Sequence, residues 1–185
     1  QANKIQVENV QYFSNPNYKN NNILHSLMYA KSFMDDDMII TYSDIWIEES
    51  LIEQIARRPE DLIVSVDTQW EELYVGRTDH PIAQAENALF DDQGVLYEIG
   101  KHIDSYIINP GLHCGEFIGL FKMSKQFCQT FVNVFDELDQ AYEKSHPFQH
   151  SQSWEKAYLT DFFCELLKRQ YLIHCNLHGK QWFEV

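Results

Sequence analysis

Short apolar runs alternate with a helical repeat along the first third of the chain. Residues 38–42 and 62–66 are continuous apolar runs, which predict strands buried on both faces. Between them, residues 48–57 have apolar positions at helical spacing, acids in the first turn and arginine at the end, which predicts a helix. A strand over 5–13 and a helix over 23–34 are predicted before this unit. The order strand, helix, strand predicts a parallel sheet with ligands at the carboxyl ends of its strands.

The rest of the chain is less regular. Residues 95–99 follow a turn at 91–94 and predict a small antiparallel arm. Further apolar patterns predict strands over 117–123, 171–175 and 182–185, and helices over 127–138 and 158–167. With no repeat or linker, we expect one domain over residues 1–185, with an α/β fold in which helices flank a mixed, mainly parallel sheet.

Composition and charge narrow the class of protein. The 185 residues are 44% hydrophobic, enough for one core, and the formal net charge is −14. Such an acidic surface repels phosphate backbones and anionic lipid, although a nucleotide can bind through a divalent cation. No run approaches the roughly 20 apolar residues of a membrane span, and the first residues lack the apolar segment of a signal peptide. We therefore expect a cytoplasmic protein without a nucleic-acid or membrane partner.

Two aspartates follow the predicted buried strands. Asp44 comes just after the first apolar run, and Asp67 comes directly after the second. A carboxylate in this place can hold Mg²⁺ by one or two oxygens while phosphate and water take the other positions, or it can cap the next helix. Both interpretations stay open for both residues. Trp70 and Tyr74, close behind Asp67, indicate a pocket wall.

Other residues have a functional and a structural interpretation. Lys101 can meet a substrate phosphate or lie on the surface, and Gly115 and Glu116 can allow a ligand to approach the backbone or form a simple turn. Asp161 can reach a substrate hydroxyl or amine, or cap the helix it begins.

Several short motifs occur in a fixed order along nearly the whole chain. They are NNILHSL at 21–27, SDI at 43–45, the segment 70–81 ending in RTDHP, Glu86, IGK at 99–101, GEFIG at 115–119, YLTD at 158–161 and WFEV at 182–185. As an ordered set they resemble the nucleoside-triphosphate transferase family of sugar-phosphate and phosphocholine cytidylyltransferases.

The resemblance implies a GT-A-like (Rossmann-like) fold and transfer of a nucleoside monophosphate, such as CMP, to a phosphate or phosphonate acceptor with release of pyrophosphate. It implies that Asp44 holds the catalytic Mg²⁺ and that Lys101 lies near the acceptor's phosphate. The expected partners are therefore a nucleoside triphosphate and a small phosphorylated acceptor. We take Asp44 and Lys101 as candidate catalytic residues and add candidate substrate-binding residues, namely Trp70, Tyr74, Gly115, Glu116 and Asp161.

Both ends of the sequence depart from the family pattern. The family begins with a strand and a glycine-rich loop ending in arginine, which grip the triphosphate, and nothing before Gln6 matches them. It usually continues the run WFEV into an aspartate that supplies a second metal carboxylate, whereas this sequence ends at Val185. We therefore expect an internal fragment of a longer enzyme that is poorly active or inactive alone.

Two other functions and the choice of acceptor stay open. A non-catalytic binding or regulatory module could keep the fold without the triphosphate loop. A metal-dependent glycosyltransferase is disfavoured because Ile45 and Trp46 follow Asp44, where D-x-D is typical. Aromatic faces of Trp70, Tyr74 and Trp46 would favour phosphocholine unless these rings only pack the arm against the sheet, whereas hydroxyl-binding Glu116 and Asp161 would favour a sugar phosphate.

Overall fold

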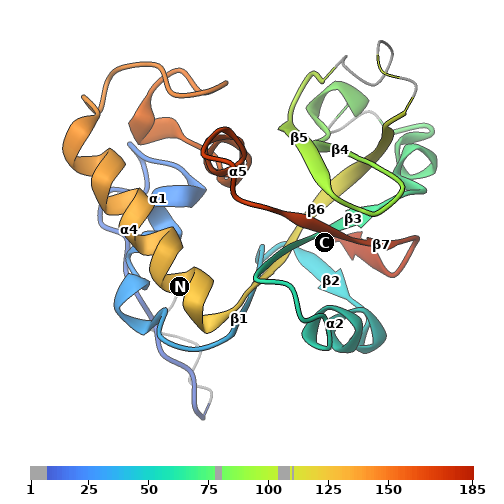
Figure 1. Ribbon diagram of the computed structural model, residues 1–185, viewed down its shortest axis with the longest axis horizontal. Helices are drawn as coiled ribbons and strands as arrows, with labels where there is room; N and C mark the ends of the chain where they lie inside the picture. The colour runs from blue at the N-terminus through green and yellow to red at the C-terminus, as the bar shows by residue number, and fades with distance from the viewer. Residues whose placement is uncertain (1–7, 78–80, 104–108, 110) are drawn as a thin grey trace.

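The computed structural model describes residues 8–77, 81–103, 109 and 111–185. Its main sheet has the strand order β5-β4-β6-β3-β7, with β1 also paired to β6 (Figure 1). The strands are β1 (Met38–Thr41), β3 (Leu62–Asp67), β4 (Asn87–Phe90), β5 (Leu96–Gly100), β6 (His113–Met123) and β7 (His174–His178). A separate two-stranded ribbon pairs β2 (Ile45–Ile47) with β8 (Trp182–Glu184).

Helices cover both faces of this sheet. The α-helices are α1 (Ile23–Met28), α2 (Glu49–Ala56), α4 (Lys125–Ala141) and α5 (Leu159–Lys168). The 3₁₀ turns are η2 (Lys31–Phe33), η3 (Trp70–Tyr74), η4 (Ile82–Gln84) and η5 (Trp154–Lys156). Helices α1, α4 and α5 pack on one face, and α2 packs on the other through Leu51 and Ile55.

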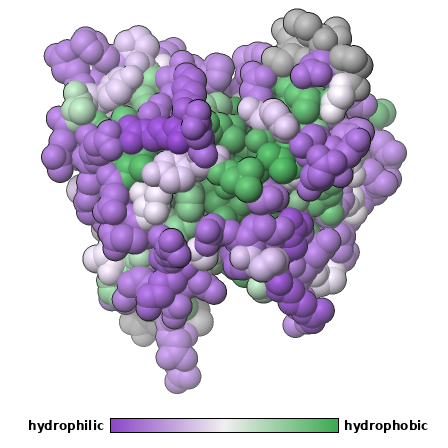
Figure 2. All heavy atoms as spheres, in the orientation of Figure 1, coloured by the Kyte–Doolittle hydropathy of each residue, from purple (hydrophilic) through white to green (hydrophobic). Residues whose placement is uncertain are grey.

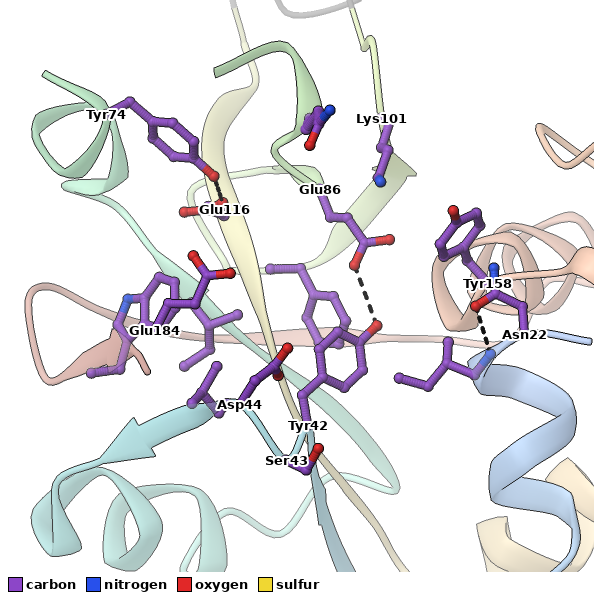
Figure 3. A pocket seen from close by; sticks show the side chains of 16 residues that line it. Asn22, Tyr42, Ser43, Asp44, Tyr74, Glu86, Lys101, Glu116, Tyr158 and Glu184 are labelled. Carbon is purple, nitrogen blue, oxygen red and sulfur yellow. Dashed lines mark hydrogen bonds between the residues drawn. The ribbon is translucent and has the colours of Figure 1, made fainter. Parts of the chain in front are cut away.

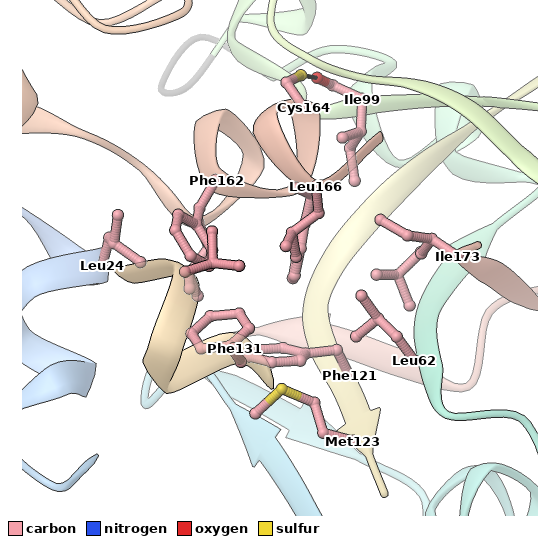
Figure 4. Close-up of a cluster of buried hydrophobic side chains, with 14 of the residues drawn as sticks. Leu24, Leu62, Ile99, Phe121, Met123, Phe131, Phe162, Cys164, Leu166 and Ile173 are labelled. Atoms are coloured by element: carbon pink, nitrogen blue, oxygen red, sulfur yellow. Dashed lines mark hydrogen bonds between the residues drawn. The ribbon is translucent and has the colours of Figure 1, made fainter. Parts of the chain in front are cut away.

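The larger core lies between α4, α5 and the sheet (Figure 4). Phe131 of α4 and Phe162 of α5 pack edge to face at 4.6 Å between ring centres, and both are fully buried. Each fully buried aromatic side chain contributes about 2–3 kcal/mol of hydrophobic stabilisation. Figure 2 shows apolar side chains gathered at the centre of one face, with polar ones around them. Among the described helices, none is long and apolar enough to cross a membrane.

The predicted α/β fold, with a mixed sheet flanked by helices and an antiparallel arm, is confirmed, but the sheet is not mainly parallel. Only β3 and β7 pair in parallel among its described strands, and the other pairings are antiparallel. Strands β1 and β3 do point the same way, as predicted. However, β6 comes from later in the chain and runs between them in the opposite direction, which the local pattern of strand, helix and strand cannot reveal.

Several predicted element boundaries also change. Residues 8–13 form no strand, and the remainder of the strand predicted over 5–13 lies outside the described residues. The first helix ends at Met28, six residues earlier than predicted over 23–34. Strand β1 alternates between half-buried and exposed positions instead of being buried on both faces, and β7 begins at His174 rather than at 171.

Candidate functional site

An open pocket of about 330 Å³ lies where β1 ends, between the β2–β8 ribbon and the start of α5 (Figure 3). The turn after β1, η3, the end of β5, β6 and β8 all contribute to its wall. Its lining consists of Asn22, Ile23, Tyr42, Ser43, Asp44, Ile45, Tyr74, Gln84, Glu86, Lys101, Glu116, Phe117, Ile118, Tyr158, Trp182 and Glu184. The structure thus brings together four of the sequence-predicted site residues, namely Asp44, Tyr74, Lys101 and Glu116.

Asp44 lies in the turn that joins β1 to β2. Its carbonyl oxygen accepts a hydrogen bond of 2.8 Å from the backbone N–H of Val185, so the end of the ribbon lies directly beside it. Its exposed carboxylate makes no hydrogen bond or ion pair with the part of the chain that the structure describes. Asp44 does not cap α2, because Glu48 occupies the N-cap position. The carboxylate therefore remains available to a ligand.

The single carboxylate of Asp44 suits a metal ion that also binds the substrate. Within the described ranges, no three His, Cys, Asp or Glu side chains form a group that could hold a metal ion. Mg²⁺ does not need such a group, because it usually takes one or two carboxylates and completes its shell with water and substrate phosphates. A single exposed carboxylate at the wall of a pocket fits that mode of binding.

Lys101 and Glu86 form the opposite wall. The Glu86 carboxylate accepts hydrogen bonds from the hydroxyls of Thr160 at 2.8 Å and Tyr42 at 3.3 Å. Burial raises the pKa of Glu86, and the nearby charge of Lys101 opposes that rise. The Lys101 ammonium lies 4.9 Å from the centre of the Tyr158 ring. The sequence placed Glu86 among the family motifs but gave no sign that two hydroxyls would hold it in the pocket wall.

Glu116 and Tyr74 meet across the pocket from Lys101. The Tyr74 hydroxyl donates to one carboxylate oxygen of Glu116, as the dashed line in Figure 3 shows. Glu116 is only 5% exposed, and its second oxygen, Oε2, has no hydrogen-bond partner among the described residues. Burial raises the pKa of Glu116 to about 7, and the neighbouring Asp67 adds to the rise. The same burial and hydrogen bond raise the pKa of Tyr74 well above its ordinary value.

Glu184 completes the acidic side of the pocket. It forms an ion pair with Arg77, whose guanidinium lies 5.4 Å from the centre of the Tyr74 ring. The sequence included Glu184 in a motif without assigning it a role. Its position follows from the pairing of β8 with β2, which places Glu184 opposite Ile45.

Three predicted site residues lie outside the pocket lining. Trp70 is buried behind Tyr74, with 5.8 Å between the ring centres. Gly115 lies where β6 crowds β3, since a Cβ atom there would clash with Val66 and lie 2.8 Å from the carbonyl oxygen of Asp67. Asp161 caps α5, accepting from the backbone N–H groups of Tyr158 at 2.8 Å and His150 at 3.0 Å and from the Ser151 hydroxyl.

Two further residues discussed from the sequence also lie off the pocket lining. The Trp46 ring stacks on Phe183 at 5.0 Å between centres. Asp67 is fully buried and accepts from the Trp182 indole N–H at 2.8 Å and the Gln69 backbone N–H at 2.7 Å. Asp67 thus anchors the ribbon beneath the pocket. Residues 78–80 of the motif at 70–81 lie outside the described residues.

Comparison with known proteins identifies the relatives of this chain. A CTP:phosphoglutamine cytidylyltransferase of Campylobacter jejuni is 28% identical over 173 residues, which cover 90% of this chain and 64% of that protein. The chain is similar to the cytidylyltransferases. This confirms the resemblance to cytidylyltransferase-like nucleotidyltransferases seen in the motifs. No protein-family model matches the chain.

Solved structures show the same fold. An inositol-1-phosphate CTP transferase of T. maritima superimposes with a TM-score of 0.59 at 14% identity, over 90% of this chain and 56% of that one. A CTP:phosphocholine cytidylyltransferase of Streptococcus pneumoniae superimposes with a TM-score of 0.56 at 11% identity, over 92% and 61%. The fold is therefore that of nucleotidyltransferases, and the chain spans less than two thirds of the length of these relatives.

Proposed function

We propose that this chain is the main part of a Mg²⁺-dependent cytidylyltransferase that transfers CMP from CTP to a small phosphorylated acceptor and releases pyrophosphate. In this proposal residues 1–185 form one domain of a protein that works in the cytoplasm, where CTP is made. The observation that carries it is the pocket at the end of β1, which is lined by Lys101 and by an Asp44 carboxylate that has no partner among the described residues.

The proposed reaction does not need a nucleophile from the protein. An oxygen of the acceptor's phosphate or phosphonate forms a bond to the α-phosphorus of CTP, and the bond to the bridging oxygen breaks as pyrophosphate leaves. Such in-line transfer depends on positioning and on neutralising charge. In this proposal Lys101 holds the acceptor's phosphate as a point charge.

The charge of the pocket supports the proposed need for a divalent cation. Four carboxylates line it, those of Asp44, Glu86, Glu116 and Glu184, whereas Lys101 is the one lysine or arginine in its described lining. A triphosphate would be repelled by this wall without further positive charge. Mg²⁺ held by Asp44 would supply that charge when bound.

The printed names of the relatives indicate the class of acceptor. They act on phosphoglutamine, inositol 1-phosphate and phosphocholine. These molecules share a phosphoryl group and a small polar body, and our proposal extends only this shared class to the present protein. No observation favours sugar transfer over nucleotidyl transfer.

The test is release of pyrophosphate by the natural full-length protein. It is incubated with MgCl₂, one of the four nucleoside triphosphates and a panel of phosphoglutamine, inositol 1-phosphate, phosphocholine and phosphoethanolamine. We expect release with CTP and at least one acceptor, and loss of release on adding EDTA. Absence of release with every triphosphate and acceptor would contradict the proposal, and CTP binding without release would favour a binding module.

A further inference from the structure

The four carboxylates of the pocket differ in the hydrogen bonds and ion pairs that they already make within the protein. Both oxygens of Glu86 accept hydroxyl hydrogen bonds, and Glu184 is paired with Arg77. Asp44 is exposed and therefore open to water or a metal. Glu116 is the exception among these four, because it is buried and its Oε2 has no donor within the described part of the chain.

A buried carboxylate oxygen without a donor is costly. Its desolvation is not offset until an N–H or O–H group reaches it, and charged donors give the stronger hydrogen bonds. The surrounding charge selects among donors, because the described lining of the pocket holds four carboxyl groups and one lysine. This negative field attracts a cation, whereas it gives a neutral hydroxyl no such advantage.

We propose that Glu116 recognises a protonated primary or secondary amine on the phosphorylated acceptor, with the ammonium donating to Oε2. The inference rests on the proposed function and narrows its substrate class. Figure 3 shows Glu116 and Lys101 on opposite sides of the pocket. An acceptor with a phosphate at one end and an ammonium at the other therefore matches the charges of both walls.

Hydrogen bonding distinguishes a protonated amine from a trimethylated headgroup. A quaternary ammonium has no N–H to donate and is held instead by the faces of aromatic rings. Trp70 is buried behind Tyr74, and Trp46 is stacked on Phe183 away from the pocket lining. Of the three rings considered from the sequence, Tyr74 belongs to the pocket lining, which also contains Tyr42, Phe117, Tyr158 and Trp182. The choice of a protonated amine therefore rests on Oε2 of Glu116, because a quaternary ammonium offers it no N–H donor.

Tyr74 acts here as a positioning residue. Its hydroxyl donates to the other oxygen of Glu116 and fixes the carboxylate against the wall. The charged and titratable groups that face Glu116 are Asp67 of β3, Tyr74 and Arg77 from η3 and the loop after it, and Glu184 of β8. Deprotonation of Glu116 should strengthen its hold on an ammonium, so the amine preference should grow between pH 6 and pH 8.

The test compares three ligands of similar size by calorimetry, namely phosphoethanolamine, 2-hydroxyethyl phosphate and phosphocholine. The full-length protein is first loaded with MgCl₂ and a CTP analogue with a non-cleavable α,β-methylene bridge. We expect phosphoethanolamine to bind at least about tenfold more tightly than the other two. Glu116→Gln should reduce this preference to within about threefold, because an amide carries no negative charge.

Matched variants separate recognition from damage to the fold. Glu71→Gln makes the same change at an exposed residue of η3 outside the pocket lining and should keep the full preference. Tyr74→Phe should weaken the preference for phosphoethanolamine without removing it. If Glu116→Gln does not fold, the preference of Tyr74→Phe tests the inference. Equal binding of the three ligands, no binding of phosphoethanolamine, or an unchanged preference in both pocket variants would overturn the inference.

Pyrophosphate release from CTP with the same three acceptors keeps the two proposals distinguishable. Release without an amine preference leaves the proposed function standing and rejects the role of Glu116. An amine preference in binding, with no release from any acceptor of either panel, rejects the function instead.

Discussion

At the scale of single residues, Glu116 and Asp161 show how neighbours decide the role of a carboxylate. Both were candidate substrate-binding residues from the sequence. The oxygens of Asp161 accept hydrogen bonds from the backbone of His150 and Tyr158 and from Ser151, whereas one oxygen of Glu116 has no partner in the described part of the chain. The sequence could not separate them, because the loop that satisfies Asp161 has no pattern that brings it to the start of α5.

The raised pKa of Glu116 predicts a measurable effect of pH on stability. The folded protein holds this proton up to about pH 7, while the unfolded chain releases it near the ordinary value of 4.5. The contribution of Glu116 to the free energy of unfolding therefore falls as pH rises from 4.5 to 7, by about 3 kcal/mol. Urea denaturation should show that the free energy of unfolding of wild type, relative to that of Glu116→Gln, falls or changes sign over this pH range. A difference that stays constant with pH would contradict the raised pKa.

His178 predicts the opposite slope. It lies opposite Asp67 across β3 and β7, and burial lowers its pKa to about 4 from an ordinary value of 6.5. Between these two pKa values the unfolded chain binds a proton on His178 and the folded protein does not. The contribution of His178 to the free energy of unfolding is therefore lost as pH falls from 6.5 to 4, by up to about 3 kcal/mol. In the same denaturation series, the advantage of wild type over His178→Asn should grow from pH 4 to 6.5, and a shrinking advantage would contradict the assignment.

At the scale of elements, the contact between β6 and β3 fixes the floor of the pocket. Gly115 has space for no side chain because β3 lies against it. Gly115→Ala should therefore destabilise the protein by about 1–3 kcal/mol through overpacking. It should also weaken substrate binding, because Glu116 is the next residue.

The matched control for this change is Gly111→Ala. Among the described residues, a Cβ atom there meets only the Asn109 side chain at 3.7 Å, which is ordinary contact. Thermal unfolding should separate the two variants by several degrees. Equal melting temperatures would show that β6 can shift away from β3 and that the packing does not fix the floor.

Elements were predictable where one local pattern dominates. Helix α2, strand β3 and the hairpin of β4 and β5 follow from apolar spacing and from a turn in which Asp91 accepts from the backbone of Gln93 and Val95. The antiparallel insertion of β6 between β1 and β3 depends on pairing between distant segments, which local spacing does not encode. The order of the motifs predicted that Asp44 and Lys101 lie in one site. Only the folded structure shows that Glu86 and Glu184 line the same pocket.

At the scale of the whole molecule, the net charge of −14 sets the electrostatic background. The ion pairs are largely at the surface and contribute little each, so repulsion among the excess acids should dominate. Raising NaCl from about 0.05 M to 0.5 M at pH 7.5 should increase the free energy of unfolding by about 1 kcal/mol, because salt screens that repulsion. Urea titrations at the two salt concentrations measure this, and a decrease would show that ion pairs outweigh repulsion.

The central claim is that Asp44 serves nucleotidyl transfer in a pocket of this fold. The most direct measurement is pyrophosphate release from CTP by the natural full-length protein, with its best acceptor, in wild type, Asp44→Asn and Asp35→Asn. Asp35 is an exposed acid outside the pocket lining, so its variant controls for loss of one charge. We predict that Asp44→Asn lowers kcat/KM by about 100-fold or more with an unchanged melting temperature, since an amide is a poor magnesium ligand. Turnover by folded Asp44→Asn within about threefold of wild type would contradict the account.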